Sequence, residues 1–270
     1  DLCEDLCPPP EDARTWPGGQ AFIQWLQATN LFVTPQDSKE EWFRFHNLFL
    51  QLLRDRLHVQ SDEAAVAQVQ RKAAAWFAAM GMIEDSAYHY LAAGDLDEVA
   101  TLMVRGRRHV INQEDWPRLT RWLGLFPADY VERTPELWII KAWSLQSRFR
   151  LNEVDLVLDK IEAHWDQLCA GQSAADAEIL SAEIATHRSQ NRCWAGDGAR
   201  SLEMARYAVA HTPSDYTGVY GNALLYLGIA MQVAGEQEDG FAMLTKALFS
   251  DDARQNPAFA ARMLVALTLM

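Results

Sequence analysis

The stretch that decides the fold is Leu224–Ala247, LLYLGIAMQVAGEQEDGFAMLTKA. Its Leu227–Gly228 pair is followed by Gly235, and the apolar spacing resumes beyond Gly240 at Leu244 and Ala247. Apolar residues three and four positions apart are typical of a helix with one buried face, and glycine is typical of a helix end. The stretch therefore predicts two helices joined by a short turn.

This template recurs along the chain at the spacing of tetratricopeptide repeats. Weaker copies are anchored on Ala74, Ala142 and Ser189, and the interval between the first two leaves room for another helix pair at 95–110 and 114–126. Such pairs cannot bury their apolar faces alone, so they stack into a superhelix with a concave groove. The repeats predict an irregular solenoid that binds a partner rather than one that performs chemistry.

The first sixty residues follow another pattern. A short helical stripe at 20–29 precedes two aromatic-rich runs, 31–33 and 42–45, that flank a polar turn at 35–38. A helix at 48–57 follows, with Leu48, Phe49, Leu52, Leu53 and Leu57 on one face. Helix, hairpin and helix are the layout of a small winged-helix domain. We therefore predict a mainly all-α chain, a winged-helix remnant with one β-hairpin followed by a tetratricopeptide-like α-solenoid.

The composition of the chain indicates its cellular compartment and the kinds of partner that it can bind. The chain of 270 residues has a net charge of −13, which disfavours direct binding to DNA or to an anionic membrane. Four cysteines and no export signal favour a cytoplasmic protein. The uncharged stretch 216–235 contains polar residues and four glycines, so we predict a buried helix there and no membrane span. The chain opens in mid-element and ends within the apolar stretch 259–270, so we expect a fragment.

Motifs for catalysis are missing from the sequence. It contains no phosphate-binding loop, no dinucleotide fingerprint, no HExxH zinc motif and no GxSxG nucleophile motif, so we predict no enzyme activity, no catalytic residue and no cofactor in this chain. Cys3 and Cys7 lie four residues apart, but no nearby ligand completes a metal site. We therefore interpret both cysteines as small buried apolar residues, and we predict no metal site.

Two groups of residues are candidates for binding. Arg105, Arg107 and Arg108 form the one basic cluster, which suits a phosphate or an acidic partner segment, or else a solvated helix end. Among ten tryptophans, Trp138, Trp143 and Trp194 could stack against a ligand, although their helical spacing also suits core packing.

Several stretches resemble the MalT-like ATP-dependent transcriptional activators with LuxR-type DNA-binding ends. They are EWFRFHNLF at 41–49, LRDRL at 53–57, AAAWF at 73–77 and AYHYLAAGD at 87–95. The resemblance covers roughly residues 20–165 by specific patterns. It implies the end of a winged helix at 1–60, a helical arm at 61–132 and a sensor superhelix at 133–270, between a missing nucleotide-binding module and a missing C-terminal DNA-binding domain.

The resemblance also implies a mechanism. ADP and the winged helix hold such a regulator closed, whereas ATP and an inducer at the superhelix permit self-association and promoter activation. His46, within FHNL, looks like the histidine that touches the β-phosphate of bound ADP in related signalling ATPases. We therefore expect a sensor fragment that binds a small-molecule inducer or a regulatory protein. The alternative is a tetratricopeptide scaffold for protein partners without a nucleotide switch, in which His46 is only structural.

Overall fold

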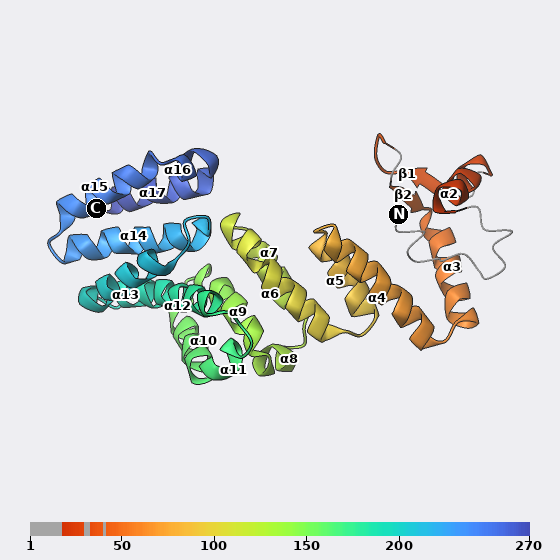
Figure 1. Cartoon of the computed structure of the whole chain (residues 1–270), viewed down its shortest axis with the longest axis horizontal. Helices are drawn as coiled ribbons and strands as arrows, with labels where there is room; N and C mark the ends of the chain where they lie inside the picture. Colours follow the sequence, from red (N-terminus) through yellow and green to blue (C-terminus); the bar gives the residue numbers. More distant parts are fainter. Residues whose placement is uncertain (1–17, 30–32, 40–41) are drawn as a thin grey trace. The chain divides into compact units, whose positions relative to one another are not determined.

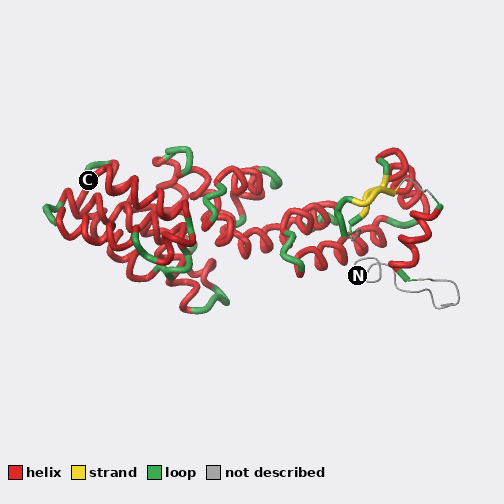
Figure 2. Tube along the Cα trace, turned by 90° about the horizontal axis from the view of Figure 1, so that it is seen from above, coloured by secondary structure: helices red, strands yellow, loops and turns green. Residues whose placement is uncertain are grey.

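The computed structural model describes residues 18–29, 33–39 and 42–270, and the chain divides into two compact units, Asp1–Leu102 and Met103–Met270. Helices dominate both units (Figure 1). Figure 2 shows the exception in yellow, a single antiparallel hairpin within the described ranges. The predicted mainly all-α fold is confirmed. The predictions for Cys3, for Cys7, for the opening segment and for residues 31–32 lie outside the described residues.

The first unit begins with the elements predicted for a winged helix. Its elements are α2 (Gly19–Ala28), β1 (Val33–Pro35), β2 (Phe43–Phe45), α3 (Asn47–Gln60), α4 (Glu63–Ala79) and α5 (Ile83–Ala92). In the hairpin Val33 pairs with Phe45 and Pro35 with Phe43. The polar turn between them is held by Asp37, whose side chain accepts a hydrogen bond from the backbone N–H of Trp42 at 3.0 Å. The predicted hairpin is therefore present.

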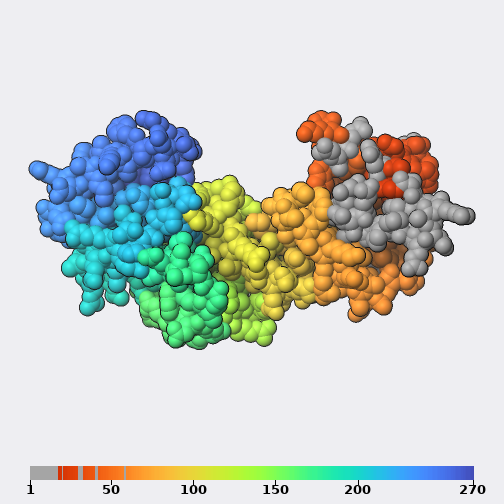
Figure 3. Space-filling view, in the orientation of Figure 1, coloured from red at the N-terminus to blue at the C-terminus, as the bar shows by residue number. Residues whose placement is uncertain are grey.

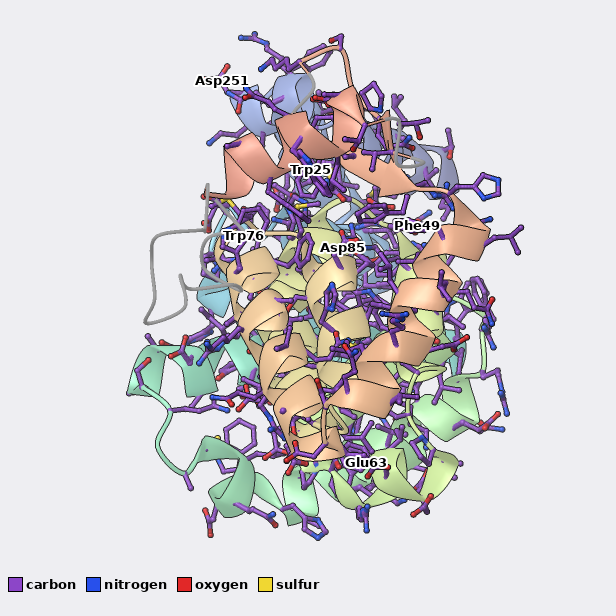
Figure 4. All side chains as sticks on the ribbon, turned by 90° about the vertical axis from the view of Figure 1, so that its right-hand side faces the viewer. Trp25, Phe49, Glu63, Trp76, Asp85 and Asp251 are labelled. Atoms are coloured by element: carbon purple, nitrogen blue, oxygen red, sulfur yellow. The ribbon has the colours of Figure 1, made fainter. Side chains whose placement is uncertain are left out.

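Aromatic contacts join the hairpin to α4. The Trp42 ring lies 6.2 Å from the rings of both Trp76 and Phe77, and Phe77 stacks on His89 of α5 at 5.2 Å. Figure 4 shows Trp76 at one end of α4 and Glu63 at the other. Asp62 caps the start of α4, because its carboxylate accepts a hydrogen bond from the N–H of Ala65. The aromatic residues of the sequence pattern thus form the contact between hairpin and helices.

Helix α3 carries a broad exposed apolar face. Leu48 is 76% exposed and Leu52 55%, and Leu53 and Leu57 are each 40% exposed. The stripe predicted from the sequence is therefore helical, but within this chain it is not buried.

The second unit is a stack of helix pairs. It contains the end of α6 (Leu96–Asn112), followed by α7 (Trp116–Leu123), α8 (Ala128–Arg133), the 3₁₀ turn η1 (Pro135–Leu137), α9 (Trp138–Gln146), α10 (Leu151–Ala163), α11 (Trp165–Cys169), α12 (Ala174–Trp194), α13 (Gly198–His211), α14 (Thr217–Val233), α15 (Gln237–Leu248), α16 (Asp251–Gln255) and α17 (Pro257–Leu269). The predicted pairs correspond to α9–α10, α12–α13 and α14–α15. Figure 3 shows the blue α14–α17 surface adjoining the cyan α12–α13 surface.

Helix α14 is a largely buried helix of this unit. The uncharged stretch predicted to be a buried helix is this element, and most of its residues are buried. Its glycines allow close approach: a Cβ on Gly218 would lie 2.3 Å from the carbonyl oxygen of Ile111, and one on Gly228 would lie 2.5 Å from Leu244. Among the described residues, no helix combines the length and apolarity needed to cross a membrane.

Candidate functional site

The second unit has a small open cavity with both polar and apolar walls, which we call the inner cavity. It has a volume of about 230 Å³ and is lined by Trp116, Trp143, Gln146, Ser147, Phe149, Gln190, Asn222, Tyr226 and Arg262. Most of these residues come from α9, α12 and α14, which are the first helices of successive pairs, and from α17. The stacking of pairs therefore brings together side chains that are far apart in the sequence, as expected for a solenoid that binds on its concave side.

Aromatic rings and amides form the walls of this cavity. Trp116 and Trp143 stack with their ring centroids 5.4 Å apart. Gln146 donates a hydrogen bond from its side chain to the side-chain oxygen of Gln190. Burial raises the pKa of Tyr226 to about 12, so its hydroxyl stays protonated and can donate. Such walls offer flat apolar faces together with hydrogen-bonding groups.

Arg262 supplies the only cationic side chain among the lining residues, and that charge is neutralised. Its Nη2 lies 2.7 Å from a carboxylate oxygen of Glu114, and its Nη1 donates to the carbonyl of Gly218 at 2.9 Å. Glu114 has a φ of 56°, in the left-handed region that non-glycine residues rarely occupy. The inner cavity is therefore close to electrically neutral.

The turn after α6 is tied to α14 and α17 by further hydrogen bonds. Asn112 donates to the carbonyl of Asp215 at 2.8 Å and accepts from the N–H of Gly218 at 3.0 Å. Asn256 donates to Thr217 at 2.8 Å and more weakly to the carbonyl of Asn112 at 3.4 Å. These bonds fix the helix that carries Arg262 relative to the rest of the cavity.

A buried polar row on α12 lies behind the inner cavity. Glu183 is fully buried and accepts hydrogen bonds from Arg107 at 3.1 Å, Trp143 at 3.1 Å and Tyr216 at 3.0 Å. Burial, then the charge of Glu183, raises the pKa of Tyr216 well above its usual value. This carboxylate joins α6, α9, α12 and the segment before α14, so it is a structural centre of the unit.

His187 lies one helical turn beyond Glu183. It is fully buried, its ring centroid is 4.3 Å from that of Trp143, and neither ring nitrogen has a hydrogen-bond partner in the part of the chain that is described. Burial, with a smaller effect of the neighbouring Arg188, lowers its pKa to about 3. His187 is therefore neutral near pH 7.

The predicted tryptophans occupy three different environments. Trp138 is buried and donates its ring N–H to the carbonyl of Val131 at 2.9 Å. Trp143 lines the inner cavity although only 1% of it is exposed. Trp194 is 61% exposed and lies 6.0 Å from Phe149. The structure does not bring the three rings together, and only Trp143 lines the inner cavity.

The predicted arginine cluster lies on α6, away from the inner cavity. Arg107 pairs with Glu183, and Arg108 pairs with Asp215 at 2.5 Å and lies over the Tyr216 ring at 5.0 Å. Arg105 is exposed, and no ion pair joins it to any residue in the described ranges. The three arginines line a second cavity.

His46 lies at the junction of β2 and α3, where it is the residue before the first helical turn, and it is exposed. No group of three or more histidine, cysteine and acidic side chains in the described ranges is placed to hold a metal ion.

The sequence did not predict most of the cavity wall: Gln146, Ser147, Phe149, Gln190, Asn222, Tyr226 and Arg262. One signal was present. Gln146 ends an apolar helix, and Asn222 interrupts the uncharged stretch 216–235, so both are polar residues where apolar ones would suffice for packing.

Comparison with known proteins gives a consistent result. Residues 1–65 match the model of the MalT winged helix domain. The chain is 28% identical over 195 residues to the HTH-type transcriptional regulator MalT of Yersinia enterocolitica, and 27% identical to those of Yersinia pestis and Yersinia pseudotuberculosis.

These matches cover 72% of the chain but only 21% of each relative, so the chain spans about a fifth of their length. No solved structure matches. The similarity to transcriptional regulators supports a regulatory role for the chain. Together, these comparisons show that the chain is similar to MalT regulators over 72% of its length and that its first 65 residues match their winged helix domain.

Proposed function

We propose that this chain is the sensor part of a nucleotide-dependent transcriptional regulator and that the inner cavity binds its inducer. The observation that carries this proposal is the convergence of successive first helices on one polar, aromatic-walled cavity. The similarity to MalT regulators supports the regulatory context. DNA binding and self-association would belong to the longer protein. The net charge of −13 disfavours direct contact between this chain and DNA.

The chemistry of the cavity favours a small, uncharged, polar inducer. Amides of Gln190 and Asn222 and the hydroxyl of Tyr226 can hydrogen-bond hydroxyl groups, while Trp116 offers an apolar face. Because Glu114 already neutralises Arg262, an anion would find no free charge. A volume of about 230 Å³ is also too small for a peptide helix, whose diameter is about 10 Å or more.

A thermal-denaturation titration tests this proposal directly. Uncharged mono- and disaccharides are the probes, because a ligand that binds only the folded state raises the midpoint with concentration. We expect at least one saturable rise, reduced in Asn222→Ala. Asn152→Ala, an exposed change on α10, is the matched control and should bind like the parent. If no probe raises the midpoint, the proposal that the inner cavity takes such a ligand fails.

Coupling to the nucleotide is a second element of the proposal. His46 is exposed at the start of α3, where the first-turn N–H groups and the helix dipole also favour phosphate. In a full-length regulator with a nucleotide-binding module, His46→Ala should speed ADP release, whereas the exposed change His109→Ala should not. Equal ADP release rates for the His46 variant and the parent would instead favour the alternative scaffold function, which the exposed apolar face of α3 supports independently.

A further inference from the structure

A second cavity in the same unit is larger than the inner cavity and is built differently. This arginine cavity has a volume of about 520 Å³, within the range of about 300–1,000 Å³ typical of small-molecule sites. It lies between the end of α6, η1 and α9, α11, and the start of α12. None of its lining residues belongs to the inner cavity.

One wall of the arginine cavity is apolar. Ile139, Ile161, Leu168 and Leu180 line it, and each is more than nine-tenths buried. Val104 and Ile179 extend this surface. A hydrocarbon chain or ring placed against these side chains would leave water at a gain of about 25 cal/mol per Å². The wall therefore suits a ligand with an apolar body.

The α6 part of the lining carries the three arginines. Arg105 is exposed without an ion pair among the described residues, so its guanidinium is open to an anion. Arg108 is paired with Asp215, whose side chain is 79% exposed. A solvent-exposed ion pair contributes little, so a ligand carboxylate can replace Asp215 on Arg108 at small cost. Arg107 is paired with Glu183, which fixes its position in the lining.

Two acidic side chains also line the arginine cavity. Asp176 accepts a hydrogen bond from Ser173 at 2.6 Å in the first turn of α12, where the helix dipole also stabilises it. Glu136 is exposed to solvent. Glu183 and Asp215 pair with two of the three arginines, so Arg105 is the lining cation that no ion pair joins to another described residue.

From this arrangement we propose that the arginine cavity is a second ligand site, which takes an amphipathic carboxylate with its apolar body on the α9–α12 wall and its carboxylate on Arg105 and Arg108. The site is distinct from the proposed inducer site. A ligand here would contact both α6 and α12, the helices that Glu183 and Arg107 already join.

Calorimetric titration with octanoate tests the proposal, with 1-octanol and octylammonium as probes of the same body and different head groups. We expect saturable binding of octanoate and at least tenfold weaker binding of the other two, since a charge-assisted hydrogen bond is worth about 1.5–3 kcal/mol. Arg105→Gln should weaken octanoate binding by about tenfold. Ile179→Trp, which fills the apolar wall, should abolish it.

Arg254→Gln is the matched control, because this exposed arginine of α16 is outside both cavities. Thermal midpoints without probe establish that each variant is folded. Equal binding of octanoate and octanol, unchanged affinity in Arg105→Gln, or no saturable octanoate binding would each overturn the proposal. None of these outcomes depends on saccharide binding, so this proposal and the proposed inducer site can fail separately.

Discussion

Arg262 on α17 and Glu114 in the turn before α7 form an ion pair at 2.7 Å, and both side chains are largely shielded from solvent. The pair contacts the inner cavity on one side and the α6–α7 turn on the other. A ligand in the inner cavity would therefore contact the ion pair that holds the last helix.

Breaking this pair should destabilise the chain by more than a surface pair would. We expect Arg262→Met and Glu114→Gln each to lower the free energy of unfolding by about 3 kcal/mol, because each leaves a buried charge unpaired. The double variant should lose less than the sum, by at least about 0.5 kcal/mol. Urea denaturation gives all three values. The exposed pair Arg254–Asp251 serves as the reference, and its coupling energy should be below about 0.5 kcal/mol. If the losses in unfolding free energy for the Glu114 and Arg262 variants simply add in the double variant, the prediction is wrong.

Acid should weaken the fold through His187. Its pKa is about 3 in the folded chain and 6.5 in the unfolded one, so the unfolded state binds the additional proton as the pH falls below about 6.5. Stability should then drop by about 2 kcal/mol between pH 7 and pH 5 from this group alone. His187→Leu removes that part of the pH dependence, whereas the exposed change His109→Leu keeps it. Chemical denaturation at a series of pH values decides between these outcomes.

The close approach at Gly218 should not tolerate a methyl group. In Gly218→Ala the new Cβ would meet the backbone oxygen of Ile111 at 2.3 Å, and backbone atoms cannot move aside as a side-chain tip can. We expect a loss of about 2 kcal/mol or more and a lower thermal midpoint. Gly124→Ala, whose nearest backbone contact would be 3.3 Å, is the control and should cost less. Equal thermal midpoints for Gly218→Ala and Gly124→Ala would show that the backbone near Gly218 can move away from Ile111.

Glu183 should be among the least replaceable acidic residues. Glu183→Gln keeps the shape but leaves Arg107 without its counter-charge, so we expect a loss of about 3–5 kcal/mol in the free energy of unfolding. Glu203→Gln on the exposed face of α13 should change stability by no more than about 0.5 kcal/mol. A tolerated Glu183→Gln would mean that hydrogen bonding at this position matters more than charge.

Local sequence patterns were sufficient to predict the helix pairs. Apolar residues at helical spacing indicate each helix, and glycine indicates where it ends; Gly196 and Gly235 both have the left-handed φ of a helix terminus. Charge and turn residues between the aromatic runs likewise predicted the hairpin. The short elements α8, α11 and α16 were not predicted, because five or six residues carry too little periodicity.

The cavity wall could not be predicted, because it depends on how the pairs stack. Gln146, Gln190 and Arg262 come from three helices, and no local pattern relates them. The tryptophans show the same limit. Trp138 and Trp143 have similar surroundings in the sequence, yet only Trp143 lines the inner cavity, since α9 turns the two rings to different neighbours.

The hydrogen bonds around Asn112 affect how the second unit should unfold. In an open array each repeat contacts only its neighbours, so the ends can fray while the middle remains folded. Here Asn256 reaches Asn112, so the last helix is anchored to the first turn of the unit. Residues 103–270 should therefore exchange their amide hydrogens in one cooperative event, and the same long-range contacts should make folding slower than in an open array of equal length.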